Sequence, residues 1–185
     1  MGRPREFDEE AATAAAMELF WERGYDGVGL TELLDAMGIV RGSLYKAYGS
    51  KRELFLRALA LYEARHVEPG VAVLKSAEGR GEDRIAAVFD AGARGGRRGC
   101  LLCNTAAGSA RLDDEVAAVV DRQLDRLTEG FAAALADTDA LRGASQAERM
   151  AEACRLTMHY VGLRVRARTG IPARALAAAA PTVGG

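Results

Sequence analysis

The sequence has 185 residues, of which 49% are hydrophobic and 28% are charged, and its formal net charge at pH 7 is −1. This apolar content supports a buried core and excludes a disordered or fibrous chain. Helix-favouring residues such as Ala, Leu, Arg and Glu dominate, and no segment alternates apolar and polar residues as a strand does. We therefore expect an all-α protein.

The sequence also predicts a cytoplasmic protein without a membrane segment. The N-terminus, Met1–Arg5, is charged, and no apolar signal-peptide core follows it. No stretch reaches the roughly 20 apolar residues that a membrane-spanning helix needs. Cysteine occurs three times, an odd number that does not suit a disulfide framework, and thiols stay reduced in the cytoplasm.

Positive charge is concentrated in one short segment. Between Gly38 and Arg57, five basic residues stand against one acid, Glu53, whereas the preceding segment from Glu6 to Asp35 is acidic. A local basic segment is the electrostatic pattern of a nucleic-acid contact, which the net charge conceals. The basic residues are Arg41, Lys46, Lys51, Arg52 and Arg57.

The N-terminal part of the chain predicts three short helices in succession. Apolar residues at helical spacing, with acids in the first turn, indicate a first helix over Phe7–Arg23. A second helix is expected over Leu30–Met37, with Gly29 at its N-cap, and a third over Arg41–Tyr48.

Further helices follow to the end of the chain. Ser50 and Glu53 form a capping box that begins a fourth helix, which we expect to run to about Val67. Glu68–Gly70 predicts a break, because proline and glycine interrupt helices. The remaining helices are expected over residues 71–78, 82–95, 101–110, 113–137, 145–169 and 172–180.

The helix–glycine–helix over residues 30–48 carries the functional inference. Two short helices joined by a tight turn at Gly38 cross steeply, so the second projects outward, where it fits the DNA major groove. Arg41 can reach a guanine edge or a phosphate, and Gly42 lets the backbone approach DNA. Lys51 begins the next helix, whose free amides help to attract a phosphate. The alternative is an ordinary helical hairpin with a solvated basic face.

Four segments of this region have a specific sequence: Phe20–Tyr25, Leu33–Ile39, Arg41–Tyr45 and Tyr48–Lys51. Together they resemble the DNA-binding domain of the TetR (tetracycline-repressor-like) family over about residues 7–55. The match extends well beyond a bare helix-turn-helix pattern.

The resemblance implies a DNA-binding domain over residues 1–50 and a ligand-binding and dimerisation domain over residues 51–185. It implies a homodimer that pairs through its last two long helices, binds double-stranded operator DNA and is released by a small-molecule inducer. The inducer's identity is unknown from the sequence, and no cofactor is implied. The DNA-facing residues carried over are Val40, Arg41, Gly42, Ser43, Tyr45, Lys46 and Lys51.

Two positions depart from the family pattern. Ala47 stands where many relatives carry histidine or another polar residue, so one DNA contact is expected to be missing. Gly29 stands where Ser or Thr is usual, which weakens the cap of the second helix. Ahead of the first helix, Arg3 and Arg5 form either a minor-groove arm, since that groove's negative potential favours arginine, or a solvent-exposed terminus.

Cys100 and Cys103 form the second candidate site. The segment Gly99–Cys103 resembles one branch of TetR-like regulators, in which Gly-Cys opens a helix of the ligand domain and some members respond to electrophiles or oxidants through a thiol. A cysteine at a helix N-terminus beside Arg97 and Arg98 should have a lowered pKa, and the thiolate is the reactive form. Cys103 is then a resolving partner; the alternative for both is a small apolar core residue.

No motif supports an enzyme or a metal site. The chain lacks a phosphate-binding glycine loop and a nucleophile elbow. Its two histidines, His66 and His159, have no paired spacing for a metal, and Cys154 is expected in the core.

The leading hypothesis is a repressor that a ligand or a thiol-reactive inducer releases from DNA. The alternatives are a thiol-disulfide active protein using Cys100-x-x-Cys103, a motif that normally follows a strand, and a non-specific architectural DNA binder.

Overall fold

Within the ranges that the structure describes, the chain forms helices joined by loops and no strands. The structure is a computed structural model, and it describes residues 7–108, 113–178 and 181. The prediction of an all-α protein is confirmed. The elements are α1 (Glu9–Arg23), α2 (Leu30–Met37), α3 (Arg41–Tyr48), α4 (Lys51–Tyr62), the π-helical turn η1 (Glu63–Val67), α5 (Glu68–Lys75), α6 (Gly81–Arg94), α7 (Leu101–Ala107), α8 (Asp114–Leu135), α9 (Gln146–Ala167) and α10 (Ala173–Ala178).

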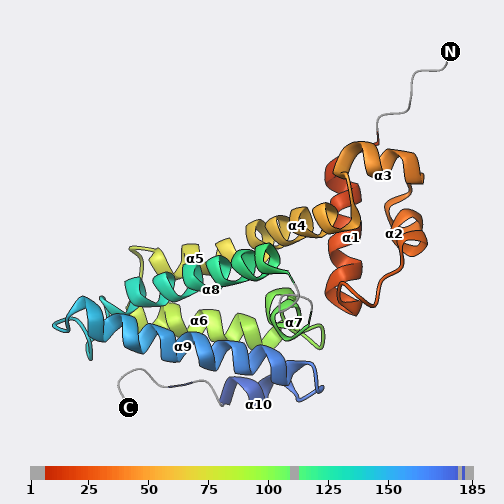
Figure 1. Cartoon of the computed structure of the whole chain (residues 1–185). Helices are drawn as coiled ribbons and strands as arrows, with labels where there is room; N and C mark the ends of the chain where they lie inside the picture. Colours follow the sequence, from red (N-terminus) through yellow and green to blue (C-terminus); the bar gives the residue numbers. More distant parts are fainter. Residues whose placement is uncertain (1–6, 109–112, 179–180, 182–185) are drawn as a thin grey trace.

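The molecule consists of two units. Figure 1 shows α1, α2 and α3 gathered at one end, with α4 leading from them into a larger group formed by α5 to α10. Contacts between α1 and α4 are extensive, so α4 belongs physically to both units. The helix-turn-helix therefore sits at one end of the molecule, away from α9 and α10.

The N-terminal helices begin and end at residues that cap them locally. Asp8 accepts two backbone amides of the first turn of α1, each at 3.0 Å, which satisfies donors that the helix itself leaves free. Gly38 ends α2 at φ +66°, a left-handed conformation that residues with side chains rarely adopt. The predicted bounds of α2 and α3 are confirmed.

The predicted break at Glu68–Gly70 is wrong, because the chain remains helical there. α4 runs into η1, and α5 begins directly afterwards with Pro69 in its first turn. Proline is tolerated at this place because the amide that it lacks would have no partner in the first turn of a helix. The π-helical turn shifts the hydrogen-bond register just before the proline, so no loop is needed.

The larger unit is built around α8 and α9. These helices lie side by side, and the hydroxyls of Thr128 and Thr157 are 2.8 Å apart in the buried layer between them. α5 and α6 pack against α8, and α10 packs against α6 and α9. Within the described residues, no helix is long and apolar enough to cross a membrane.

The segment that carries Cys100 also contacts α1 of the N-terminal unit. Arg98, just before α7, pairs with Glu18 of α1 at 2.6 Å and lies 4.2 Å from the centre of the Trp21 ring. Asn104 of α7 donates to the Trp21 carbonyl at 3.4 Å. A displacement of α7 would therefore change its contacts with α1 directly.

Candidate functional site

α3 presents one face to the core and the other to solvent. Leu44 and Tyr48 are buried, whereas Val40 is 71% exposed and Tyr45 is 48% exposed. Large apolar side chains with this exposure are candidates for contact with another molecule. Of the other predicted DNA-facing residues on α3, Arg41, Gly42 and Lys46 are exposed and Ser43 is half-buried.

The basic side chains of α3 differ from those of the neighbouring helices. Arg23 and Arg57 pair with carboxylates, whereas neither Arg41 nor Lys46 pairs with any carboxylate of the described residues. α3 also begins at Val40 without a side-chain cap, so the positive end of its dipole is not neutralised. This face is therefore suited to a polyanion.

Lys51 has a structural role that the sequence did not indicate. Its ammonium donates to the carbonyls of Tyr25 and Val28, both at 2.7 Å, and lies 4.3 Å from the centre of the Tyr25 ring. Partial burial lowers the pKa of this ammonium. Lys51 thus closes the loop between α1 and α2, and one of its three N–H donors is left for a phosphate.

The structure locates both departures from the family pattern. Gly29 begins α2 without a side-chain cap, as expected, and an added Cβ there would meet nothing within 4 Å. Ala47 is partly buried against the core, and its carbonyl accepts from Arg57 at 3.2 Å. Arg3 and Arg5, the residues of the predicted arm, lie outside the described residues.

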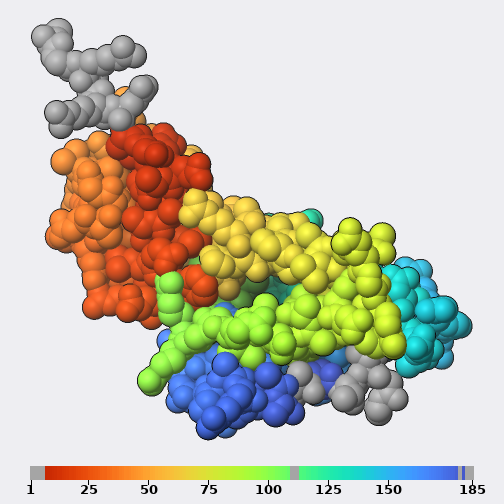
Figure 2. Space-filling view, turned by 180° about the vertical axis from the view of Figure 1, so that it is seen from behind, coloured from red at the N-terminus to blue at the C-terminus, as the bar shows by residue number. Residues whose placement is uncertain are grey.

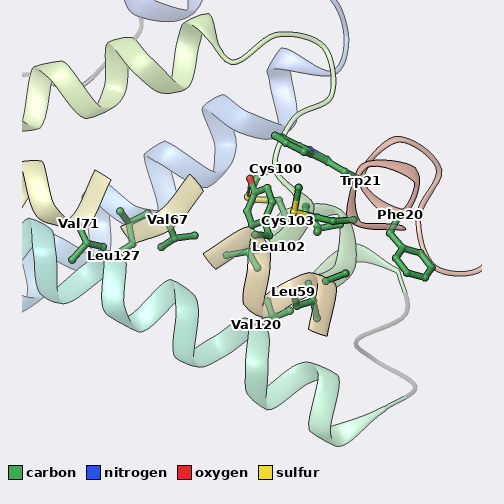
Figure 3. Close-up of a cluster of buried hydrophobic side chains, with 14 of the residues drawn as sticks. Phe20, Trp21, Leu59, Val67, Val71, Cys100, Leu102, Cys103, Val120 and Leu127 are labelled. Atoms are coloured by element: carbon green, nitrogen blue, oxygen red, sulfur yellow. Dashed lines mark hydrogen bonds between the residues drawn. The ribbon is translucent and has the colours of Figure 1, made fainter. Parts of the chain in front are cut away.

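Cys100 and Cys103 are buried together. Cys100 is the N-cap of α7, so the predicted helix start at this cysteine is confirmed, and each cysteine is 7% exposed. The hydroxyl of Tyr62, on α4, donates to the Sγ of Cys100 at 3.5 Å. Figure 3 shows the two thiols side by side in an apolar cluster, between Trp21 of α1 and Leu59 of α4.

The pKa values of the two thiols move in opposite directions. The Cys103 thiol and the Tyr62 hydroxyl donate to Cys100, and the charge of Arg164 acts in the same sense, so the pKa of Cys100 falls to about 6 despite burial. The pKa of Cys103 rises, because its proton is held by Cys100 and because it is buried. These contacts therefore favour the thiolate on Cys100 over a thiolate on Cys103.

Arg164 of α9 has a role beside Cys100 that the sequence did not indicate. It is 6% exposed, and it donates to the backbone carbonyls of Gly92 and Gly99. No carboxylate of the described residues pairs with it, so its charge is available to the Cys100 thiolate. Arg98, which the sequence favoured for this role, is instead engaged with α1.

The glycines before α7 make room for α9. A Cβ at Gly95 would overlap the guanidinium of Arg164, and a Cβ at Gly92 would come within 2.7 Å of the Tyr160 ring. Absence of a side chain is therefore required for close packing at both positions. The sequence signal was a glycine-rich segment, but its partner on α9 becomes apparent only once the helices are docked.

Two adjoining hollows lie beside the cysteines. An inner cavity of about 40 Å³ is lined in part by Cys100, Cys103 and Gln123. An outer cleft of about 470 Å³ opens between α5 and α6. Figure 2 shows this face hollowed between the yellow α4–α5 segment and the yellow-green α6. The residues that line both hollows are Tyr62, His66, Gly70, Val88 and Tyr160.

The prediction that Cys154 belongs to the core is wrong. Cys154 is exposed on α9, as are Met158 (63%) and Val165 (50%). Apolar periodicity in a helix does not distinguish a face buried within the chain from an apolar face that points outward. Across the described ranges, no group of three or more His, Cys, Asp or Glu residues could hold a metal ion.

This fold and this exposed helix define a helix-turn-helix DNA-binding protein with a helical C-terminal unit that contains a cavity. The family described as "Bacterial regulatory proteins, tetR family" matches residues 12–58. The uncharacterized HTH-type transcriptional regulator YezE of Bacillus subtilis (strain 168) is 36% identical over 139 residues, which cover 71% of this chain and 70% of YezE. The HTH-type transcriptional repressor BdcR of Escherichia coli (strain K12) is 38% identical over 105 residues, or 55% of this chain and 53% of BdcR.

Solved structures show the same relationship. A cysteine-substituted variant of the TetR family transcriptional regulator CifR, complexed with 26-base-pair double-strand operator DNA, superimposes with a TM-score of 0.83 at 30% identity. That comparison covers 96% of this chain and 95% of CifR. The chain belongs to the TetR family, a family of transcriptional regulators rather than enzymes, and it is a DNA-binding transcriptional regulator.

Proposed function

We propose that the chain is a cytoplasmic homodimeric repressor that binds a near-palindromic operator through α3 and leaves it when an inducer reaches the cavity beside Cys100. The outward face of α3 carries this proposal, because it combines exposed apolar side chains with basic side chains that pair with no carboxylate of the described residues. The relative BdcR is itself named a repressor, which supports the direction of regulation.

Each side chain of the α3 face has a role in this proposal. Arg41 contacts a guanine edge or a phosphate, Lys46 contacts a phosphate, and Tyr45 and Val40 lie against base edges and sugars. Gly42 and Ser43 allow close approach of the backbone, and the remaining N–H of Lys51 donates to a phosphate. If Arg3 and Arg5 form an arm, they enter the neighbouring minor groove.

We further propose that residues 1–50 form the DNA-binding domain and residues 51–185 the ligand-binding and dimerisation domain. The exposed apolar side chains Met158 and Val165 on α9 favour pairing of α8 and α9 with their copies. Pairing is also required for specificity, since one recognition helix makes too few contacts and two-fold symmetry doubles them.

The inducer acts, in this proposal, through the thiolate of Cys100, as in the branch of the family that the Gly99–Cys103 segment resembles. The thiolate adds to the electrophilic carbon of an unsaturated carbonyl compound, a C–S bond forms, and the resulting enolate takes a proton from water. With a peroxide, the Cys100 thiolate instead attacks one peroxide oxygen, the O–O bond breaks with release of hydroxide or alkoxide, and a sulfenic acid forms on Cys100. The Cys103 thiol then condenses with this sulfenic acid to form a disulfide and releases water. A ligand that binds reversibly in the same cavity would bias the same equilibrium.

In this proposal, few contacts separate Cys100 from the DNA-binding helices. Modification of Cys100 crowds Tyr62 on α4 and displaces α7, which contacts Trp21 and, through Arg98, Glu18 on α1. α1 supports the recognition helix, so its movement changes the spacing between the two α3 helices of a dimer. Only a difference in operator affinity between the two states is needed.

The DNA-binding part is tested by the variants Arg41→Ala and Tyr45→Ala. Each should weaken operator binding by about tenfold or more, the loss expected for one good base contact. Fluorescence anisotropy with an operator selected from random duplexes measures this. Lys75→Ala removes an exposed positive charge far from α3 and is the matched control. Wild-type affinity in both variants would show that α3 is not the reading helix.

The sensing part is tested by alkylation. Modification of Cys100 should release operator from the wild-type protein and not from Cys100→Ser. Unchanged operator affinity after stoichiometric modification would remove the thiol mechanism and leave a reversible ligand.

The alternatives predict different results. A thiol-disulfide active protein using Cys100 and Cys103 would turn over in an insulin-reduction assay. An architectural DNA binder would bind operator and random DNA equally at matched salt. Neither result is expected.

A further inference from the structure

One buried polar atom at the inner cavity has no partner. Gln123 of α8 is 2% exposed, and it lines both the inner cavity and a more open cleft that Leu56 and Glu63 also border. Its Nε2 donates to the carbonyl of Leu59 at 3.2 Å, whereas its Oε1 accepts from no group of the described residues. A buried acceptor without a donor is costly, so the cavity is incomplete without a molecule that supplies one.

The orientation of this amide is fixed by its surroundings. Rotating the amide by half a turn would place Oε1 against the Leu59 carbonyl, oxygen against oxygen. The nitrogen must therefore face α4, and the oxygen remains the unpaired atom. In the rotated orientation, Oε1 would face an acceptor and would again lack a hydrogen-bond donor.

None of the protein's own donors at the cavity, among them the His66 ring and the Tyr160 hydroxyl, donates to Oε1 of Gln123 within the described residues. The Tyr62 hydroxyl donates to Cys100, and the proton of the Cys103 thiol is held by Cys100 as well. No other side chain of the described residues donates to Gln123. The missing donor must come from a ligand or from a water molecule.

The two hollows define the shape and charge of such a ligand. The inner cavity, about 40 Å³, admits only the end of an organic molecule, whereas the outer cleft, about 470 Å³, holds its body. The cleft is lined by Trp21, Tyr160 and Val88 but also by Arg65 and Arg164. Arg164 disfavours a cationic ligand, and the Cys100 thiolate at the inner cavity disfavours an anionic one. The donor is therefore a neutral hydroxyl or amide N–H.

We propose that Gln123 is a specificity-determining residue of the effector site, and that it selects uncharged, largely apolar ligands that carry a hydroxyl or amide N–H at the end that enters the inner cavity. This inference rests on the ligand site of the proposed function and adds the chemical class of its ligand. It does not require that the ligand react with Cys100.

The test compares two probes of nearly equal shape, benzyl alcohol and ethylbenzene, on the wild-type protein and on Gln123→Met. Methionine keeps the length of glutamine and has no strong acceptor, and the Leu59 carbonyl retains the backbone N–H of Glu63 as a donor. Binding is followed by the fluorescence of Trp21, the one tryptophan of the chain, which lines the outer cleft. Circular dichroism checks that the variant is folded.

The wild-type protein should favour benzyl alcohol over ethylbenzene, relative to Gln123→Met, by about five- to tenfold. An equal ratio of dissociation constants in the two proteins, or binding of neither probe, overturns the proposal. A crystal structure with benzyl alcohol should place the hydroxyl within hydrogen-bond distance of Oε1. A water that stays on Oε1 while the alcohol lies elsewhere overturns it as well.

Operator binding by the wild-type protein is measured separately. If operator is bound and alkylation releases it, but the probe ratio does not depend on Gln123, this inference fails and the proposed function stands. If wild-type protein binds no operator, the proposed function fails, and the probe ratio still decides the role of Gln123.

Discussion

At the scale of single residues, Cys100 is defined by what surrounds it rather than by its neighbours in sequence. Its thiol accepts from Tyr62 and Cys103 and lies in the field of Arg164, and these groups outweigh burial. A thiolate at neutral pH is the reactive form of cysteine. The thiol of Cys100 is therefore activated, and the small cavity around it excludes most large molecules.

We predict that Cys100 reacts with iodoacetamide at a rate that rises through pH about 6 and levels off above it. A free cysteine has its midpoint near pH ~8.5. The measurement is the rate of carbamidomethylation at Cys100, followed by mass spectrometry across pH.

The matched variant for this prediction is Tyr62→Phe. It removes the hydroxyl that donates to Cys100 and keeps the ring, so the pKa of Cys100 should rise and the midpoint should move to higher pH. A wild-type midpoint close to that of free cysteine would contradict this description of the thiol.

The sequence predicted the position of Cys100 but not its electrostatic partner. The start of α7 at Cys100 follows from local pattern, so it could be predicted. The arginine that acts on the thiol, Arg164, comes from a helix far along the chain. Proximity in sequence favoured Arg97 and Arg98 instead, and no local rule can rank a contact that depends on how α9 docks.

At the scale of elements, features that depend on local sequence could likewise be predicted, and features that depend on helix packing could not. The bounds of α2 and α3 were predicted because capping residues and glycines act within one or two turns. The break at Glu68–Gly70 was wrong because a proline in the first turn of a helix and a proline that ends one have the same local sequence. Packing of α5 on α8 decides between them.

The weak cap of α2 gives a prediction about stability. Gly29→Ser should add a hydroxyl that accepts an amide of the first turn, in open space and at extended backbone angles. The expected gain is about 0.3 kcal/mol, or about 1 °C in Tm. Calorimetry measures it, with Gly143→Ser, in a loop with equally open space, as the control. A loss of stability would contradict the capping argument.

The junction of α4 and α8 gives a prediction about pH. Asp113 caps α8, and its carboxylate receives two N–H groups of Arg52, which hold the pKa of Asp113 down to about 2. A carboxyl whose folded pKa is depressed stabilises the fold above its unfolded pKa. That stabilisation is lost as pH falls from about 4 to about 2.

Asp113→Asn keeps an N-cap and loses the charge. It should therefore be less stable than the wild type at neutral pH and should lack this part of the acid dependence, measured by urea unfolding between pH 7 and pH 2. Asp114→Asn, which removes another carboxylate from the same first turn, is the control and should retain it. Parallel pH curves for wild type and Asp113→Asn would contradict the role of the Arg52 pair.

At the scale of the whole molecule, the outward faces of α9 and α3 share one property. Both expose apolar side chains that a solitary chain leaves in water. The spacing of apolar residues along a helix does not tell which apolar stripe is covered within the chain. This is why Cys154 was expected in the core and is exposed.

Dimerisation through α9 predicts the effect of a charge on that face. Met158→Asp should convert the dimer to a monomer in sedimentation equilibrium, because a carboxylate would be buried without a partner. Operator affinity should fall by at least about tenfold, since half of the contacts are lost. Val73→Asp, at an exposed apolar residue on α5, is the control. A dimer that persists in Met158→Asp would place the interface elsewhere.

The most direct test of the account is a hydroxyl-radical footprint on a selected operator. Two α3 helices related by a two-fold axis should protect two symmetric half-sites about one helical turn apart or slightly wider. Both protections should disappear together in Arg41→Ala and in Met158→Asp, and alkylation of Cys100 should abolish them in the wild type. A single protected half-site, or uniform protection of any DNA, would contradict the proposed dimeric repressor.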